Sequence, residues 1–146
     1  MHIRPATASD LETIIAHRIA MFRDMGYSDD VLAQVETVSR EILRPALSDG
    51  SYYSVLAEVE DNGVVGGAGV LILPWPGYQP RRAWIQNVYV LPEFRRRGIA
   101  REMMQSLLAR CRAEGFDSVS LHASDEGFPL YLQLGFLPTN EMWLKF

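Results

Sequence analysis

The segment from Ala83 to Ala100 joins a strand, a turn and the start of a helix, and it constrains the fold more than any other part of the chain. Ala83–Leu91 is rich in aromatic and β-branched residues, which is typical of a strand, and Pro92 ends it. Arg95–Arg97 then precede Gly98, after which apolar residues recur at helical spacing. A strand that leads into an amphipathic helix predicts a domain in which helices pack on a sheet.

The rest of the chain predicts further elements on both sides of this segment. Helical spacing indicates four helices. The first ends near Asp24, the second begins near Ser28, the third runs from Ile99 to Cys111, and the fourth covers Gly127–Leu134. We expect Pro45 to disturb the second of these helices. Strand-like runs, with a hairpin turn at Asn62-Gly63, lie at Ile3–Ala6, Tyr52–Glu60, Val64–Leu73, Ala83–Leu91 and Ser118–Ala123, followed by a closing strand pair from Phe136 and Met142–Phe146. This order predicts a single α/β or α+β domain over residues 1–146.

The composition fits a globular domain and excludes several classes of protein. The chain has 146 residues, 48% of them apolar, so it can form a full core and is too apolar to be disordered. No stretch approaches the ~20 apolar residues of a membrane helix, and the N-terminus lacks an apolar signal sequence, so we expect a cytoplasmic protein that has no membrane partner. A net charge of −4 argues against nucleic-acid binding.

The cysteine and histidine content gives no sign of a disulfide or a metal site. The one cysteine, Cys111, excludes an intramolecular disulfide, and its place on an apolar helix stripe predicts a core residue. The three histidines are scattered and lack metal-ligand spacing. We expect His17 on a helix surface and His122 as a hydrogen-bonded structural side chain.

The start of the helix after Gly98 is a predicted anion-binding site. A helix N-terminus leaves its first backbone N–H groups without partners inside the helix, and the helix dipole favours negative charge there. Gly98 lets the backbone approach an anion, Ala100 leaves room, and Arg95–Arg97 add positive charge. A pyrophosphate fits this arrangement, although the motifs of a P-loop and of a dinucleotide-binding turn are both missing. A solvated helix face is the alternative for the arginines taken alone.

Two motifs resemble the GNAT superfamily of acyl-coenzyme A-dependent N-acyltransferases. Arg95-x-x-Gly98-x-Ala100, preceded by a Val-Tyr-Val strand, is similar to that family's Gln/Arg-x-x-Gly-x-Gly/Ala pyrophosphate loop. Tyr131-x-x-x-Gly135-Phe136 resembles its Tyr-x-x-x-Gly-Phe ending. The resemblance covers nearly the whole chain. It implies a mixed, mostly antiparallel central sheet flanked by helices, with a splayed strand pair that forms an acyl-coenzyme A cleft.

The resemblance also implies roles for individual residues. The backbone of Val88, Tyr89 and Val90 is expected to bind pantetheine and to polarise the thioester carbonyl. Tyr131 falls at the position that protonates the departing thiolate, and Ser124 stands where many members have an asparagine that contacts the cofactor. The remaining cofactor-binding residues form the pyrophosphate loop, namely Arg95, Arg96, Arg97, Gly98, Ile99, Ala100 and Arg101.

The general base departs from the family pattern. Many members carry a glutamate on the Val-Tyr-Val strand, where this chain has Ile85-Gln86-Asn87, and neither amide is a useful base. The candidates that remain are solvent, a water chain, and a carboxylate from elsewhere, namely Glu58 or Asp24. The acceptor pocket is implied at the junction of the first two helices and beside the same strand. Its candidate residues are Phe22, Tyr27, Glu58, Gln86 and Asn87, although core packing explains Phe22 equally well.

These observations predict an enzyme that transfers an acetyl group from acetyl-coenzyme A to a primary amine in a direct ternary complex. Cys111 is in the wrong place for a covalent intermediate. The alternative is a non-catalytic acyl-coenzyme A binding module, which the missing glutamate favours and Tyr131 disfavours. An interaction domain whose arginines bind an acidic partner is a second alternative, opposed by the net charge of −4. The resemblance also allows a homodimer.

Overall fold

The computed structural model describes residues Met1–Phe146 and is built on one five-stranded sheet in the order β1-β2-β3-β4-β5. The strands are β1 (His2–Pro5), β2 (Tyr52–Val59), β3 (Gly63–Pro74), β4 (Arg81–Val90) and β5 (Val119–Ser120). β1 to β4 pair antiparallel, and β5 runs parallel to β4. The predicted mixed, mostly antiparallel sheet is therefore confirmed.

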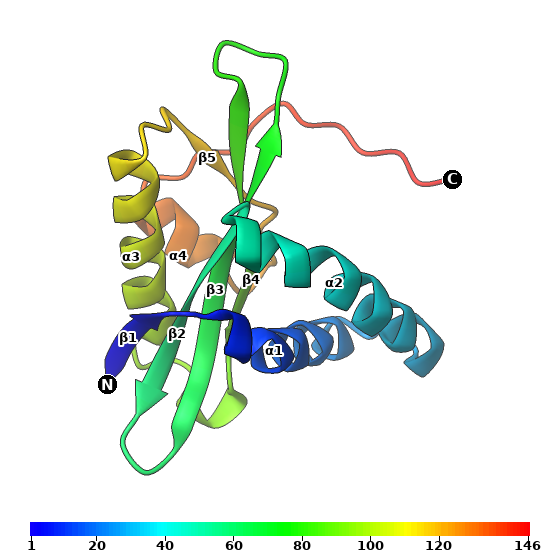
Figure 1. The fold of residues 1–146 in the computed structure, drawn as a ribbon, viewed down its shortest axis with the longest axis vertical. Coiled ribbons are helices and arrows are strands. Elements are labelled where there is room, and N and C mark those ends of the chain that lie inside the picture. The colour runs from blue at the N-terminus through cyan, green and yellow to red at the C-terminus, as the bar shows by residue number, and fades with distance from the viewer.

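Helices cover both faces of this sheet (Figure 1). α1 (Leu11–Asp24) and α2 (Asp29–Asp49) pack on one face, and α3 (Ile99–Ala113) and the short α4 (Phe128–Gln133) pack on the other. Single 3₁₀ turns precede α1 and α3, at Ala8–Asp10 and Pro92–Phe94. The result is three layers, with the sheet in the middle.

Each face of the sheet buries its own apolar cluster, because side chains alternate along a strand. On β2, Val55 and Ala57 face α3, whereas Tyr52 and Leu56 face α1 and α2. The apolar stripe of α3 completes the first cluster with Met103, Met104, Leu107 and Cys111. The predicted core position of Cys111 is confirmed.

Pro45 does not interrupt α2, contrary to our expectation. The helix continues for four further residues to Asp49. Proline removes one backbone hydrogen bond from a helix interior. Leu43 and Ala46, which flank Pro45 closely, are both buried. Packing of this last part of the helix therefore outweighs the lost hydrogen bond.

The C-terminal part of the chain has less strand than the sequence predicts. β5 is limited to Val119–Ser120, instead of Ser118–Ala123, and Phe136 and Met142–Phe146 form no strands. After α4 the chain passes β5, and only its last residues run away from the sheet (Figure 1), so Met142, Trp143 and Phe146 are exposed. A strand exists only where a neighbour accepts its hydrogen bonds, and the two-residue β5 gives the last segment little edge to pair with.

His17 is buried in the sheet-facing side of α1, so the prediction of a surface position is wrong. Its exposed fraction is 7%, and its Nδ1 atom has no hydrogen-bond partner. The absence of a side chain at Gly67 makes room for it, since a Cβ there would lie 3.1 Å from His17 Nδ1. Burial lowers the pKa of His17, because a low-dielectric site disfavours the charged imidazolium.

Acid should therefore destabilise the fold through His17. Above the unfolded-state pKa of ~6.5 the buried neutral imidazole contributes its full stability, and below it the unfolded chain takes up a proton that the folded protein resists. We expect the free energy of unfolding, measured with denaturant, to fall between about pH 7.5 and about pH 5.5. His17→Leu should reduce this fall, and His2→Leu, at an exposed position, should not. An unchanged pH dependence in His17→Leu would contradict this account.

Candidate active site

β4 separates from β5 after a short paired stretch. The two strands pair only at Ala83↔Val119 and Trp84↔Ser120, whereas β4 continues to Val90. The backbone of β4 beyond Trp84 is therefore unpaired on its β5 side, as a splayed strand pair requires. This part of the predicted fold is present.

A β-bulge interrupts the other edge of β4 at the same level. Between the pairs Gly69↔Gln86 and Gly67↔Tyr89, β4 has one residue more than β3. Asn87 within this bulge has a φ of 57°, which is a left-handed conformation that is uncommon outside glycine. A bulge bends a strand and re-aims its side chains, so it accompanies the separation of β4 from β5.

A row of unpartnered backbone N–H groups follows β4. From Arg96 to Arg101 no backbone N–H donates to a backbone carbonyl, and the first such donor in α3 is Glu102, which bonds the Gly98 carbonyl at 3.1 Å. No side chain caps this helix. Arg96 and Gly98 have φ values of 63° and 82°. A turn with left-handed positions directly before a helix start directs neighbouring N–H groups to one side, and such a set of donors suits an anion.

Two of the three loop arginines brace the turn. Arg95 Nε donates to the Val90 carbonyl at 2.9 Å, and its Nη2 pairs with Asp24 at 2.8 Å. Arg97 Nη2 donates to the Glu93 carbonyl at 2.8 Å. Arg96 is exposed and remains available to a ligand. Asp24, a candidate base, is thus an ion-pair partner of Arg95.

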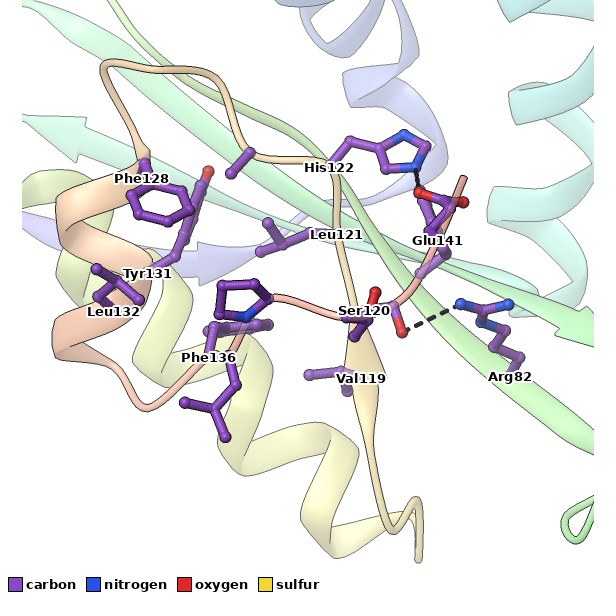
Figure 2. A pocket seen from close by; sticks show the side chains of 15 residues that line it. Arg82, Val119, Ser120, Leu121, His122, Phe128, Tyr131, Leu132, Phe136 and Glu141 are labelled. Carbon is purple, nitrogen blue, oxygen red and sulfur yellow. Dashed lines mark hydrogen bonds and ion pairs between the residues drawn. The ribbon is translucent and has the colours of Figure 1, made fainter. Parts of the chain in front are cut away.

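Tyr131 lies beneath a cleft of about 360 Å³ between β5, α4 and the chain after Phe136 (Figure 2). Its exposed fraction is 8%, and its ring packs edge-to-face against Phe136 with centroids 5.8 Å apart. Burial alone raises the pKa of the Tyr131 phenol. The hydroxyl is therefore protonated at neutral pH and can donate a proton.

Ser124 and Tyr131 meet at Gly127. A Cβ on Gly127 would lie 2.9 Å from Tyr131 Cε2 and 3.3 Å from Ser124 Oγ. The Ser124 hydroxyl accepts a hydrogen bond from the Gly127 N–H at 3.1 Å, at the start of α4. The structure thus brings these two predicted site residues together, with a local role for Ser124 in the turn before α4.

The turn from Arg95 to Gly98 does not line this cleft. The cleft carries Trp84 and His122 at its other end, where the His122 Nε2 atom lies 2.6 Å from Glu141 Oε2 (Figure 2). His122 is hydrogen-bonded, as predicted. A contact between Arg101 and Gln133 connects the first turn of α3 to α4.

No group of side chains in the protein is arranged to hold a metal ion, and none of its helices could cross a membrane.

The acceptor candidates fall into two places. Phe22 and Tyr27 pack together with ring centroids 5.2 Å apart. Gln86 and Asn87 lie at the bulge. Glu58 is separate from them. It lies on β2, where it accepts a hydrogen bond from Arg4 of the edge strand β1 at 2.7 Å.

Arg18, which was not predicted as a site residue from the sequence, lies beside Gln86 and Asn87. Its Nη1 atom is 2.7 Å from Asn87 Oδ1 and 3.5 Å from Gln86 Oε1. The available signal was a charged residue on the apolar stripe of α1, four residues from both Ile14 and Phe22.

Known proteins with similar sequences and folds agree on one family. The model of the acetyltransferase (GNAT) family matches residues 17–136. A GCN5-related N-acetyltransferase from Ralstonia eutropha is 35% identical with a TM-score of 0.92, over 99% of this chain and 97% of that one. A predicted acetyltransferase from Clostridium acetobutylicum, solved with acetyl-CoA, is 24% identical with a TM-score of 0.84, over 99% and 94% of the two chains. No curated protein matches.

Proposed function

We propose that this chain, which belongs to the acetyltransferase (GNAT) family, transfers an acetyl group from acetyl-coenzyme A to a primary amine in a direct ternary complex. Acetyl-coenzyme A and the amine are the two partners that this reaction needs. Neither a metal ion nor nucleic acid is required for it.

The observation that carries the proposal is the row of free N–H groups from Arg96 to Arg101 beside the open edge of β4. The pyrophosphate of coenzyme A is an anion that can accept from these donors, with Arg96 adding positive charge. A pantetheine chain can then follow the unpaired edge of β4, where it accepts and donates hydrogen bonds as a strand would. This path would bring the thioester to the bulge.

Backbone groups of Val88, Tyr89 and Val90 would polarise the thioester carbonyl. β4 and β5 no longer pair at these residues, so their outward-facing N–H groups are available to a ligand, although the Val90 carbonyl already accepts from Arg95. An N–H group aimed at the carbonyl oxygen stabilises the negative charge that develops when the amine attacks. The rigid sheet holds this donor in place before the reaction begins.

Tyr131 would protonate the departing thiolate. The tetrahedral intermediate collapses with cleavage of the carbon–sulfur bond, and coenzyme A leaves as a thiolate that takes a proton. A buried, protonated phenol next to the cleft can supply that proton. No nucleophilic side chain is needed, because the amine attacks the thioester directly.

Neither of the two predicted carboxylates is free to deprotonate the incoming ammonium. Glu58 is paired with Arg4 and Asp24 with Arg95, and Gln86 and Asn87 are neutral amides. We therefore infer that water removes this proton, and that the fraction of neutral amine in solution limits the reaction at low pH.

The pH dependence of kcat/KM should consequently follow the amine and not the enzyme. With two amines of different pKa, the acidic limb of the plot of kcat/KM against pH should move by the difference between their pKa values. Glu58→Gln and Asp24→Asn should leave its position unchanged. A limb that stays at one pH for both amines, or that disappears in one of these variants, would show that a protein base operates. Loss of the limb in Asn87→Ala would contradict our assignment of this strand.

The alternative is an acyl-coenzyme A binding module without catalysis, which the pairing of both predicted bases with arginines favours. Such a module would bind acetyl-coenzyme A at the same turn but would release no coenzyme A when an amine is added. Amine-dependent release of the thiol therefore separates the two functions.

A further inference from the structure

Arg18 is a half-buried cation without an acidic partner. None of the protein's ion pairs includes it, although its side chain is half-buried. Its only hydrogen-bond partners are the neutral amide oxygens of Asn87 and Gln86. A charge removed from water without a counter-ion is costly, so this site favours a negatively charged ligand.

The Arg18 guanidinium is held in one orientation. The Asn87 side-chain NH₂ group donates to the buried Tyr52 hydroxyl at 3.0 Å, which directs its oxygen toward Arg18 Nη1. Gly69 makes room for Tyr52, because a Cβ there would overlap the hydroxyl at 2.0 Å. On α1, the Phe22 ring lies 5.1 Å from the guanidinium carbon and supports one face of the group.

This arrangement leaves part of the guanidinium free. Arginine has five N–H donors, and both hydrogen bonds use Nη1. Nε and Nη2 together form the fork that binds a carboxylate with two parallel hydrogen bonds. Asn87 directly precedes Val88, where the proposed reaction takes place. A short molecule can therefore reach from Arg18 to the thioester.

We infer that Arg18 binds a carboxylate of the acceptor, so that the acceptor is an amine that also carries a carboxylate group. This inference rests on the proposed function and adds the chemical class of the acceptor. In it, Arg18 is a positioning residue that holds one end of the acceptor while the amine at the other end attacks the thioester.

The test compares amino carboxylates with their uncharged carboxamides, such as 4-aminobutanoate with 4-aminobutanamide and β-alanine with its amide. For the wild-type enzyme, kcat/KM calculated per neutral amine, which corrects for the different amine pKa values of each pair, should favour the carboxylates by about tenfold to a hundredfold, which is the usual effect of a hydrogen bond to a charged group. Arg18→Gln should remove the preference, and Arg18→Lys should restore part of it. Arg40→Gln, whose native side chain pairs with Glu12 and Glu36, should leave it unchanged.

The ratio of the two rates separates recognition from structural damage. If Arg18 serves only to support the bulge, Arg18→Gln would lower both rates equally and keep the ratio. That result would overturn the inference, as would a wild-type enzyme that prefers the carboxamides or acetylates none of the carboxylates. A preference for phosphoethanolamine over every amino carboxylate would overturn the assignment of a carboxylate. The proposed function fails in a different way. It is wrong if acetyl-coenzyme A does not bind, or if none of the amines tested, including a simple amine such as butylamine, is acetylated.

Discussion

Gly98→Asp is expected to abolish binding of acetyl-coenzyme A while the protein remains folded. The new carboxylate would lie at the start of α3 beside the free N–H groups of Arg96 to Arg101. It would repel the pyrophosphate and could also accept hydrogen bonds from these donors in its place, since aspartate is a good N-cap. Calorimetric titration with acetyl-coenzyme A measures the loss.

Gly50→Asp is a matched control for this variant. Gly50 and Gly98 share a φ of 82°, and neither has any atom within 4 Å of the position that a Cβ would take. Both substitutions should therefore cost a similar ~1–2 kcal/mol of stability from the left-handed backbone. Gly50 lies at the end of α2, so its variant should bind acetyl-coenzyme A normally. An unchanged affinity in folded Gly98→Asp would contradict the proposed pyrophosphate site.

Tyr131→Phe is expected to lower kcat by up to about 10²-fold and to leave the affinity for acetyl-coenzyme A nearly unchanged. A proton donor to the thiolate acts in the transition state and contributes little to the bound ground state. The decrease in kcat should lie at the low end of the range of rate effects that general acid catalysis gives, because a thiolate leaves readily without a proton. The phenylalanine ring keeps the contact with Phe136, so stability should hardly change.

Steady-state kinetics under conditions where chemistry limits turnover would measure this effect. Tyr53→Phe is the control, since Tyr53 of β2 packs against Arg110 of α3 and has no part in the proposed reaction. If Tyr131→Phe turns over at the wild-type rate, Tyr131 is a packed aromatic residue and not the general acid.

Most of the fold could be predicted because it depends on local patterns. The apolar stripe of α3, the hairpin at Gly63 and the strand before Pro92 each carry their signal within a few residues. The start of α3 after Gly98 was predictable for the same reason. The closing strand pair was wrong because strand-like sequence alone does not provide a neighbouring edge, and β5 provides very little.

The candidate site was less predictable because its key contacts join residues far apart in the chain. The burial of His17 depends on the gap at Gly67, and the orientation of Arg18 depends on Asn87 and Tyr52. The pairing of Glu58 with Arg4, which removes a candidate base, likewise joins two strands. Periodicity shows which face a residue occupies, but it does not identify its partner on another element.

Release of the coenzyme A thiol by the wild-type protein, with and without added amines, tests the central claim most directly. The proposed function predicts that a primary amine increases the rate of release and that the product gains one acetyl group by mass spectrometry. If acetyl-coenzyme A binds but its thiol is released at the same low rate with and without every amine, the protein is a binding module and the proposed acetyl transfer is wrong.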